Sequence, residues 1–196
     1  MTIKRQLEIA IAHAREVDDI YRLNYLGSDN ISRSVDILRE ISQDYLGKRV
    51  EYYTHPMSYN AGQAIRGFCL KFPEHYEIAL LSGQNFCWTR LVLSKEIFQV
   101  LIDKPEYRTH DIAGLIEQAI ISFPAPTSDD NLPLLSESLA EIASMEFLFP
   151  YKERDALIVG LQGQDPDYAA IADRYKLPRV MVERYLSKSL MAALKL

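Results

Sequence analysis

The sequence predicts an α+β protein, in which helices and strands occupy separate parts of the chain. Apolar residues recur every three or four positions near both ends, which is typical of amphipathic helices. Aromatic and β-branched residues, which favour strands, are concentrated between residues 49 and 81. Because the two patterns are segregated and do not alternate, we expect a small antiparallel sheet of about three strands beside a helical core.

The N-terminal segment is expected to form a helical hairpin. One apolar face runs through about residues 3–25, and a second amphipathic helix follows a turn of capping residues at 27–30. Gly47 then stands where helices commonly end, because glycine adopts the left-handed conformation without a steric penalty.

The predicted sheet follows directly. A first strand is expected from about residue 49, and a proline and its polar neighbours are expected to end it in a loop at 55–60. Two further strands are expected at 65–72 and 76–81. The short connection between these two strands predicts an antiparallel hairpin.

Helical patterns return after the sheet. Helices are expected at residues 86–101, 110–122 and 136–148, with a proline-containing linker at 123–128. Two or three shorter helices are expected after Pro150. We therefore divide the chain into three parts: an N-terminal helical segment (1–47), a central core (48–150) and a C-terminal helical segment (151–196).

Composition narrows the class of protein. The 196 residues are 48% hydrophobic and 25% charged, which is typical of a globular chain. A formal net charge of −5 argues against a general nucleic-acid binder, which needs a basic surface. No apolar run approaches the ~18 residues that span a bilayer, and two cysteines do not make a disulfide scaffold. We therefore expect a cytoplasmic protein without a membrane partner.

Three pieces of the central core, taken in order, carry the most information about function. The first is the predicted hairpin between residues 67 and 80, and the second is the helix RLVLSKEIFQVL at 90–101. The third is the helix ESLAEIA at 137–143, which is followed by FLFP at 147–150. Together they resemble the ImmA/IrrE family of zinc metallopeptidase-like proteins. That family has a strand pair, an R-F-T-L-A-H-E-x-x-H helix, and an E-x-E-A-x-x-F-A helix ending in L-L-M-P.

The resemblance implies a metallopeptidase fold over about residues 50–150, with a degenerate active site. In an intact HExxH helix, two histidines one turn apart hold zinc, and the glutamate activates the metal-bound water. Here Lys95 and Gln99 stand at the two histidine positions, and only Glu96, the general-base position, remains. Glu137 or Glu141 would stand at the third-ligand position. Because an ammonium cannot coordinate zinc and an amide is a weak ligand, we expect no catalytic residues, no metal and no cofactor.

A related hypothesis concerns the charge of the lost metal. If Lys95 lies beside Glu137 or Glu141, its ammonium would take the place of the metal and satisfy the carboxylate electrostatically. Such a replacement would keep the fold intact without zinc.

The resemblance also implies a function. Family members typically act on helix-turn-helix repressors of phage, mobile elements or stress regulons. We therefore expect a catalytically inactive, regulatory protein that binds such a partner without cutting it. One alternative is an active zinc endopeptidase with non-standard ligands. None of the four histidines has the spacing for this, although His110 begins the helix after the motif.

A second alternative is a DNA-binding regulator. Residues 167–186 resemble a helix-turn-helix unit, in which Arg179, Arg184 and Lys188 would contact DNA. From residue 161 to 196 there are six Lys and Arg against four Asp and Glu, a modest local excess of +2. The competing interpretation is a helical hairpin packed on the core, and for this reason nucleic acid is not the favoured partner.

Overall fold

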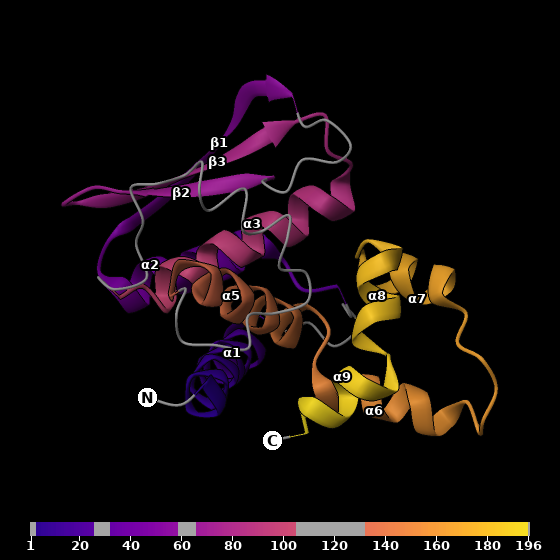
Figure 1. Ribbon diagram of the computed structural model, residues 1–196. Helices are drawn as coiled ribbons and strands as arrows, with labels where there is room; N and C mark the ends of the chain where they lie inside the picture. The colour runs from indigo at the N-terminus through magenta and orange to yellow at the C-terminus, as the bar shows by residue number, and fades with distance from the viewer. Residues whose placement is uncertain (1–2, 26–31, 59–65, 105–131, 196) are drawn as a thin grey trace.

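The structure is a computed structural model that describes residues 3–25, 32–58, 66–104 and 132–195 (Figure 1). Its strands are β1 (Arg49–Ser58), β2 (Gly67–Lys71) and β3 (His75–Ser82). Its helices are α1 (Ile3–Tyr25), α2 (Val35–Leu46), α3 (Phe86–Leu101), α5 (Leu132–Leu148), α6 (Tyr151–Gly160), α7 (Tyr168–Tyr175), α8 (Arg179–Tyr185) and α9 (Lys188–Ala193). The expected α+β class is confirmed. The turn at 27–30, the helix at 110–122 and the linker at 123–128 lie outside the described residues.

The three-stranded sheet is mixed, whereas an antiparallel sheet was predicted. Strand β3 lies in the centre; β2 pairs with it antiparallel, as the expected hairpin, and β1 pairs with it parallel. Parallel neighbours need a crossover connection, and here strand β2 and its flanking segments form that connection. Strand propensity does not encode direction, which explains the wrong prediction.

Strand β1 is also longer than predicted. It continues through His55 and Pro56 to Ser58, residues that were expected to form a loop. In the part of the chain that the structure describes, β1 is an edge strand, which is where sheets tolerate proline. The register shifts between His55 and Ser58, where the proline interrupts regular pairing.

The first two helices form as expected. Ser34 caps α2, because its hydroxyl accepts a hydrogen bond from the Ile37 N–H. Gly47 ends the helix with a φ of 62°, in the left-handed region. Helix α1 packs against α5, although residues 26–131 separate them in sequence.

Helix α3 occupies the centre of the molecule. It packs against the sheet on one side and against α5 on the other, and α2 also contacts it (Figure 1). Buried hydrophobic residues from all three parts of the chain, from Ala10 to Leu194, join one continuous cluster. No helix in the described ranges is long and apolar enough to cross a bilayer.

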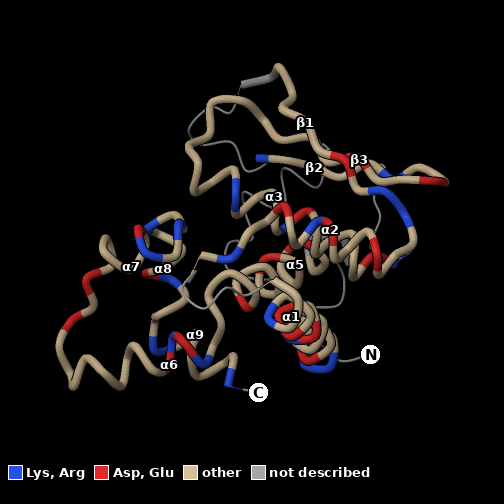
Figure 2. The backbone as a smooth tube through the Cα atoms, turned by 180° about the vertical axis from the view of Figure 1, so that it is seen from behind, with Lys and Arg blue, Asp and Glu red and all other residues tan. Residues whose placement is uncertain are grey.

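Four short helices, in place of the expected two or three, make up the described C-terminal segment. They lie together beside the α-helical core (Figure 1). Along α7 and α8, basic residues are interleaved with acidic ones (Figure 2). The guanidinium of Arg90 in α3 donates to the main-chain oxygens of Tyr175 and Lys176, at 2.8 and 3.0 Å. These carbonyls end α7, where a cation is favoured by the helix dipole.

Candidate functional site

Helices α3 and α5 bring four of the residues singled out from the sequence into one cluster. Lys95 and Gln99 are one turn apart on α3, so they share a face that is turned toward α5. Glu137, near the start of α5, lies opposite both of them. Glu96 follows Lys95 and is almost fully buried. We call Lys95, Glu96, Gln99 and Glu137 the lysine cluster.

Glu137 contacts both Lys95 and Gln99. One of its carboxylate oxygens, Oε2, forms a short ion pair with the Lys95 ammonium. The other, Oε1, accepts a hydrogen bond from the Gln99 amide at 2.6 Å. Lys95 Nζ also lies 3.0 Å from Glu96 Oε1. The ammonium is therefore held between two carboxylates that come from different helices.

Glu96 is the least satisfied member of the cluster. Its side chain is 1% exposed, and neither carboxylate oxygen accepts a hydrogen bond from any described residue. The Lys95 ammonium lies 3.0 Å from Oε1 and forms an ion pair with it. Burial raises the pKa of Glu96, the charge of Lys95 opposes the shift and the charge of Glu137 adds to it, so that the pKa is about 7.

Lys95 remains a cation in these surroundings. Burial alone would lower its pKa, but the charges of Glu137 and Glu96 outweigh that effect and raise the pKa above the ordinary value. The same carboxylates also affect the pKa of the Cys69 thiol. Its pKa is raised chiefly by burial and then by the charges of Glu96 and other nearby acids, so Cys69 stays a thiol and not a thiolate.

The lysine cluster does not fit a divalent metal. A zinc ion needs several lone pairs directed at one point, from histidine, thiolate or carboxylate ligands. Here an ammonium and an amide N–H point at Glu137, and both are donors. Within the described ranges, no group of three or more His, Cys, Asp and Glu residues lies close enough to bind a metal ion. His110 lies outside these ranges.

Glu141, the other candidate for the third-ligand position, faces a different helix. Its Oε1 accepts hydrogen bonds from the Arg184 guanidinium at 2.9 Å and from the Tyr185 hydroxyl at 3.1 Å, both on α8. Burial and then the charge of Glu141 raise the pKa of Tyr185 well above its ordinary value. Of the two glutamates, the structure therefore places only Glu137 in the lysine cluster.

The three residues expected to contact DNA have different surroundings. Arg179, on α8, is exposed and pairs with Glu183 one turn away at 2.7 Å. Arg184 is bound to Glu141 of α5. Lys188 is exposed and begins α9. The three residues were expected on the second helix of the unit, but only Arg179 and Arg184 lie on α8.

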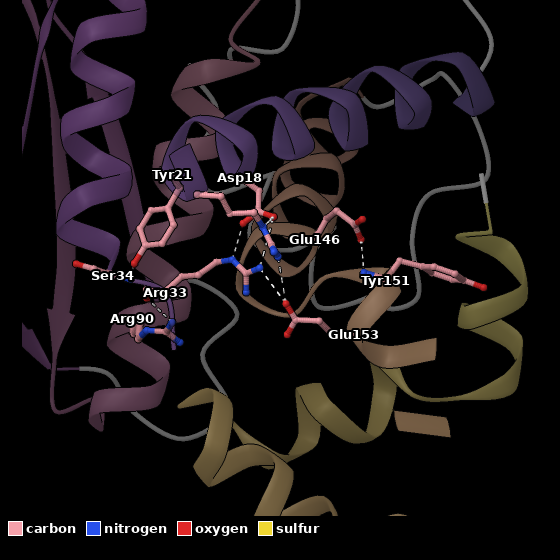
Figure 3. Close-up of polar contacts among 9 residues, drawn as sticks. Asp18, Tyr21, Arg33, Ser34, Arg90, Glu146, Tyr151 and Glu153 are labelled. Atoms are coloured by element: carbon pink, nitrogen blue, oxygen red, sulfur yellow. Dashed lines mark hydrogen bonds and ion pairs between the residues drawn. The ribbon is translucent and has the colours of Figure 1, made fainter. Parts of the chain in front are cut away.

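Two buried ionic groups were not foreseen from the sequence. In the first, Arg33 is 5% exposed and binds Asp18 of α1 at 2.6 Å and Glu153 of α6 at 3.0 Å (Figure 3). Burial alone would lower the pKa of Arg33, but the hydrogen bonds and charges of these two acids outweigh it and raise the pKa. Arg90 adds a hydrogen bond to the main-chain oxygen of Arg33 at 2.5 Å. These contacts join α1, α3, α6 and the entry to α2.

The second group attaches α6 to α5. Arg154 is fully buried and donates to Glu146 Oε2 at 2.8 Å. The Tyr151 N–H donates to the same oxygen (Figure 3). Burial lowers the pKa of Arg154, and Glu146 opposes the shift. Sequence reasoning treated residues 150–154 as a helix stop and restart. An arginine inside a polar stretch shows no pattern that would have identified it as buried.

The sequence matches no protein-family model and no curated protein.

Proposed function

We propose that this chain is a catalytically inactive relative of the ImmA/IrrE metallopeptidases, and that it acts in the cytoplasm by binding a protein. One observation carries the proposal: the Lys95 ammonium lies between Glu96 and Glu137, with Gln99 donating to Glu137. The resemblance equates Lys95 and Gln99 with the two histidines, Glu96 with the general base, and Glu137 or Glu141 with the third metal ligand.

The chemistry of these side chains supports binding without hydrolysis. Peptide hydrolysis by this class of enzyme needs a metal to polarise the carbonyl and to activate water. In the lysine cluster, the Lys95 ammonium occupies the carboxylates of Glu96 and Glu137, which would otherwise be available to a metal. Glu96 is also buried. The ion pairs of Lys95 with Glu96 and Glu137 occupy the groups that would otherwise react. The helices and their outer surfaces remain, and these can still bind a partner.

The partner follows from the resemblance alone. Members of the resembled family act on helix-turn-helix repressors of phage, mobile elements or stress regulons. We therefore propose a repressor of this type as the bound protein, and regulation of that repressor by sequestration as the biological effect.

The test uses the untagged chain and helix-turn-helix repressors cloned from the genome that encodes it. Each repressor is incubated with the chain, once with added zinc and once with EDTA, and complex formation and intact mass are measured. We expect a complex in both conditions, with the repressor uncut.

Two outcomes would contradict the proposal. Zinc-dependent cleavage that is lost in Glu96→Gln would establish the active-peptidase alternative. Failure of every such repressor to bind in either condition would remove the binding role.

A second candidate is DNA binding through α7 and α8. The observation in its favour is their geometry: an eight-residue helix and a seven-residue helix are joined by a turn at residues 176–178. Duplex DNA binding that weakens with salt and on Arg179→Ala, but not on the exposed Lys152→Ala, would support it. No binding at low salt would exclude it.

A further inference from the structure

Lys95 occupies a site that side chains of two helices form around it. Its ammonium is paired with Glu137 of α5 and lies 3.0 Å from Glu96 Oε1 of α3. Gln99, one turn along α3, holds the other oxygen of Glu137 at 2.6 Å. Glu137 is therefore fixed in position by one partner while it contacts the cation with its other oxygen.

The charges in this site do not balance. Two carboxylates face one ammonium, and Glu96 is 1% exposed with no hydrogen bond to either oxygen from the described residues. A buried acceptor without a hydrogen-bond donor lowers the stability of the folded state, and such acceptors are uncommon in folded proteins. Its oxygen is nevertheless directed at the ammonium, which is the arrangement expected of a group that receives a cation.

We propose that Glu96, Glu137 and Gln99 form a recognition site for a primary ammonium group, which the folded chain fills with its own Lys95. This inference does not depend on the proposed binding of a protein partner, and its tests are separate from that one.

The chemistry of the site favours an ammonium over a metal ion. An ammonium carries three N–H donors, which match the separate oxygens of two carboxylates. The Gln99 amide presents an N–H to Glu137, so its donor side, and not its oxygen, faces the site. Among the residues that the structure describes, a divalent metal would find two carboxylates here and no third His, Cys, Asp or Glu ligand.

Chemical rescue tests this directly. Lys95→Ala removes the ammonium and the methylenes that carry it, and propylammonium matches the lost group. We expect Lys95→Ala to melt at a lower temperature than the wild type, and propylammonium to raise that temperature in a saturable way. Tetramethylammonium, which has the charge but no N–H donor, is expected to have no such effect.

Matched variants identify the site of rescue. Adding Glu137→Gln to Lys95→Ala is expected to abolish the response to propylammonium. Lys152→Ala, at an exposed lysine on α6, is expected to show no response. The proposal is overturned if propylammonium and tetramethylammonium act alike on Lys95→Ala, or if zinc raises its melting temperature more than propylammonium does.

A second measurement covers the case in which Lys95→Ala does not fold. In the wild-type chain labelled with ¹⁵N-lysine, the ammonium protons of Lys95 are expected to exchange with water much more slowly than those of exposed Lys152. Glu137→Gln is expected to accelerate that exchange. Exchange of Lys95 as fast as that of Lys152 in the wild type would contradict the proposal.

Discussion

Lys95 and Glu96 are adjacent in sequence, yet their side chains converge on a single point. Lys95 reaches Glu137 on the neighbouring helix and passes 3.0 Å from Glu96 on the way. One ammonium is thus shared by two carboxylates. Glu96 is the less stabilised of the two, because it is buried without a hydrogen bond among the described residues. This is the physical cause of its raised pKa.

Glu96→Gln should therefore change how stability depends on pH. The folded state holds the pKa of Glu96 at about 7, above the value of roughly 4.3 in an unfolded chain. Above pH 7 the buried charge destabilises the wild type, and below about pH 4.3 the group is neutral in both states. We expect Glu96→Gln to be the more stable protein at pH 8, by about 3–4 kcal/mol, and the difference to fall to about 1 kcal/mol at pH 5 and to vanish below about pH 4.

Urea unfolding of both proteins across this pH range measures the difference. Glu40→Gln, at an exposed position on α2, provides the control for the substitution itself. A Glu96→Gln difference that stayed constant from pH 5 to pH 8 would show that the carboxyl does not titrate near neutrality.

Among the helices, α5 has two roles one turn apart. Glu137 completes the lysine cluster, while Glu141 holds α8 through Arg184 and Tyr185. The sequence could not distinguish the two glutamates, because positions four apart share a helix face. Only the placement of α3 and α8 on that face decides which acid meets which partner.

Glu141→Gln should loosen α8 selectively. The substitution weakens a charge-assisted contact with Arg184 and a hydrogen bond to a buried tyrosine, at a cost of about 1–2 kcal/mol. Hydrogen exchange of the peptide covering 179–185 is expected to accelerate. Glu183→Gln breaks only the exposed pair with Arg179 and is expected to change little. Equal effects of the two substitutions would mean that Glu141 does not anchor α8.

Two glycines should respond oppositely to alanine. A Cβ on Gly67 in β2 would lie 2.8 Å from Val92 Cγ1 and 3.0 Å from the Ala79 carbonyl oxygen. Gly67→Ala should therefore disturb the packing of β2 on α3 and lower the free energy of unfolding by about 1–3 kcal/mol. A Cβ on Gly160, at the end of α6, would meet no atom within 4 Å. There alanine should be neutral or stabilising by up to about 1 kcal/mol. Denaturant midpoints measure both, and a neutral Gly67→Ala would contradict the close packing.

Across the whole chain, periodicity predicted what depends on local pattern and missed what depends on distant partners. The boundaries of α1, α3 and the β2–β3 hairpin were predicted because spacing and turn residues specify them. The direction of β1 was not, because it depends on how the chain crosses between strands. Arg33 and Arg154 look like surface residues in sequence, and their burial depends on acids that only the folded chain brings near.

At the scale of the whole protein, we propose that Lys95 supplies the positive charge that a metal would bring to this helix pair. Equilibrium dialysis against zinc, followed by zinc analysis of the untagged wild-type chain, tests this proposal. We expect far less than one zinc per chain and an unchanged melting temperature. About one zinc per chain, lost in Glu137→Gln, would contradict it, because a metal would then occupy the position assigned to the ammonium.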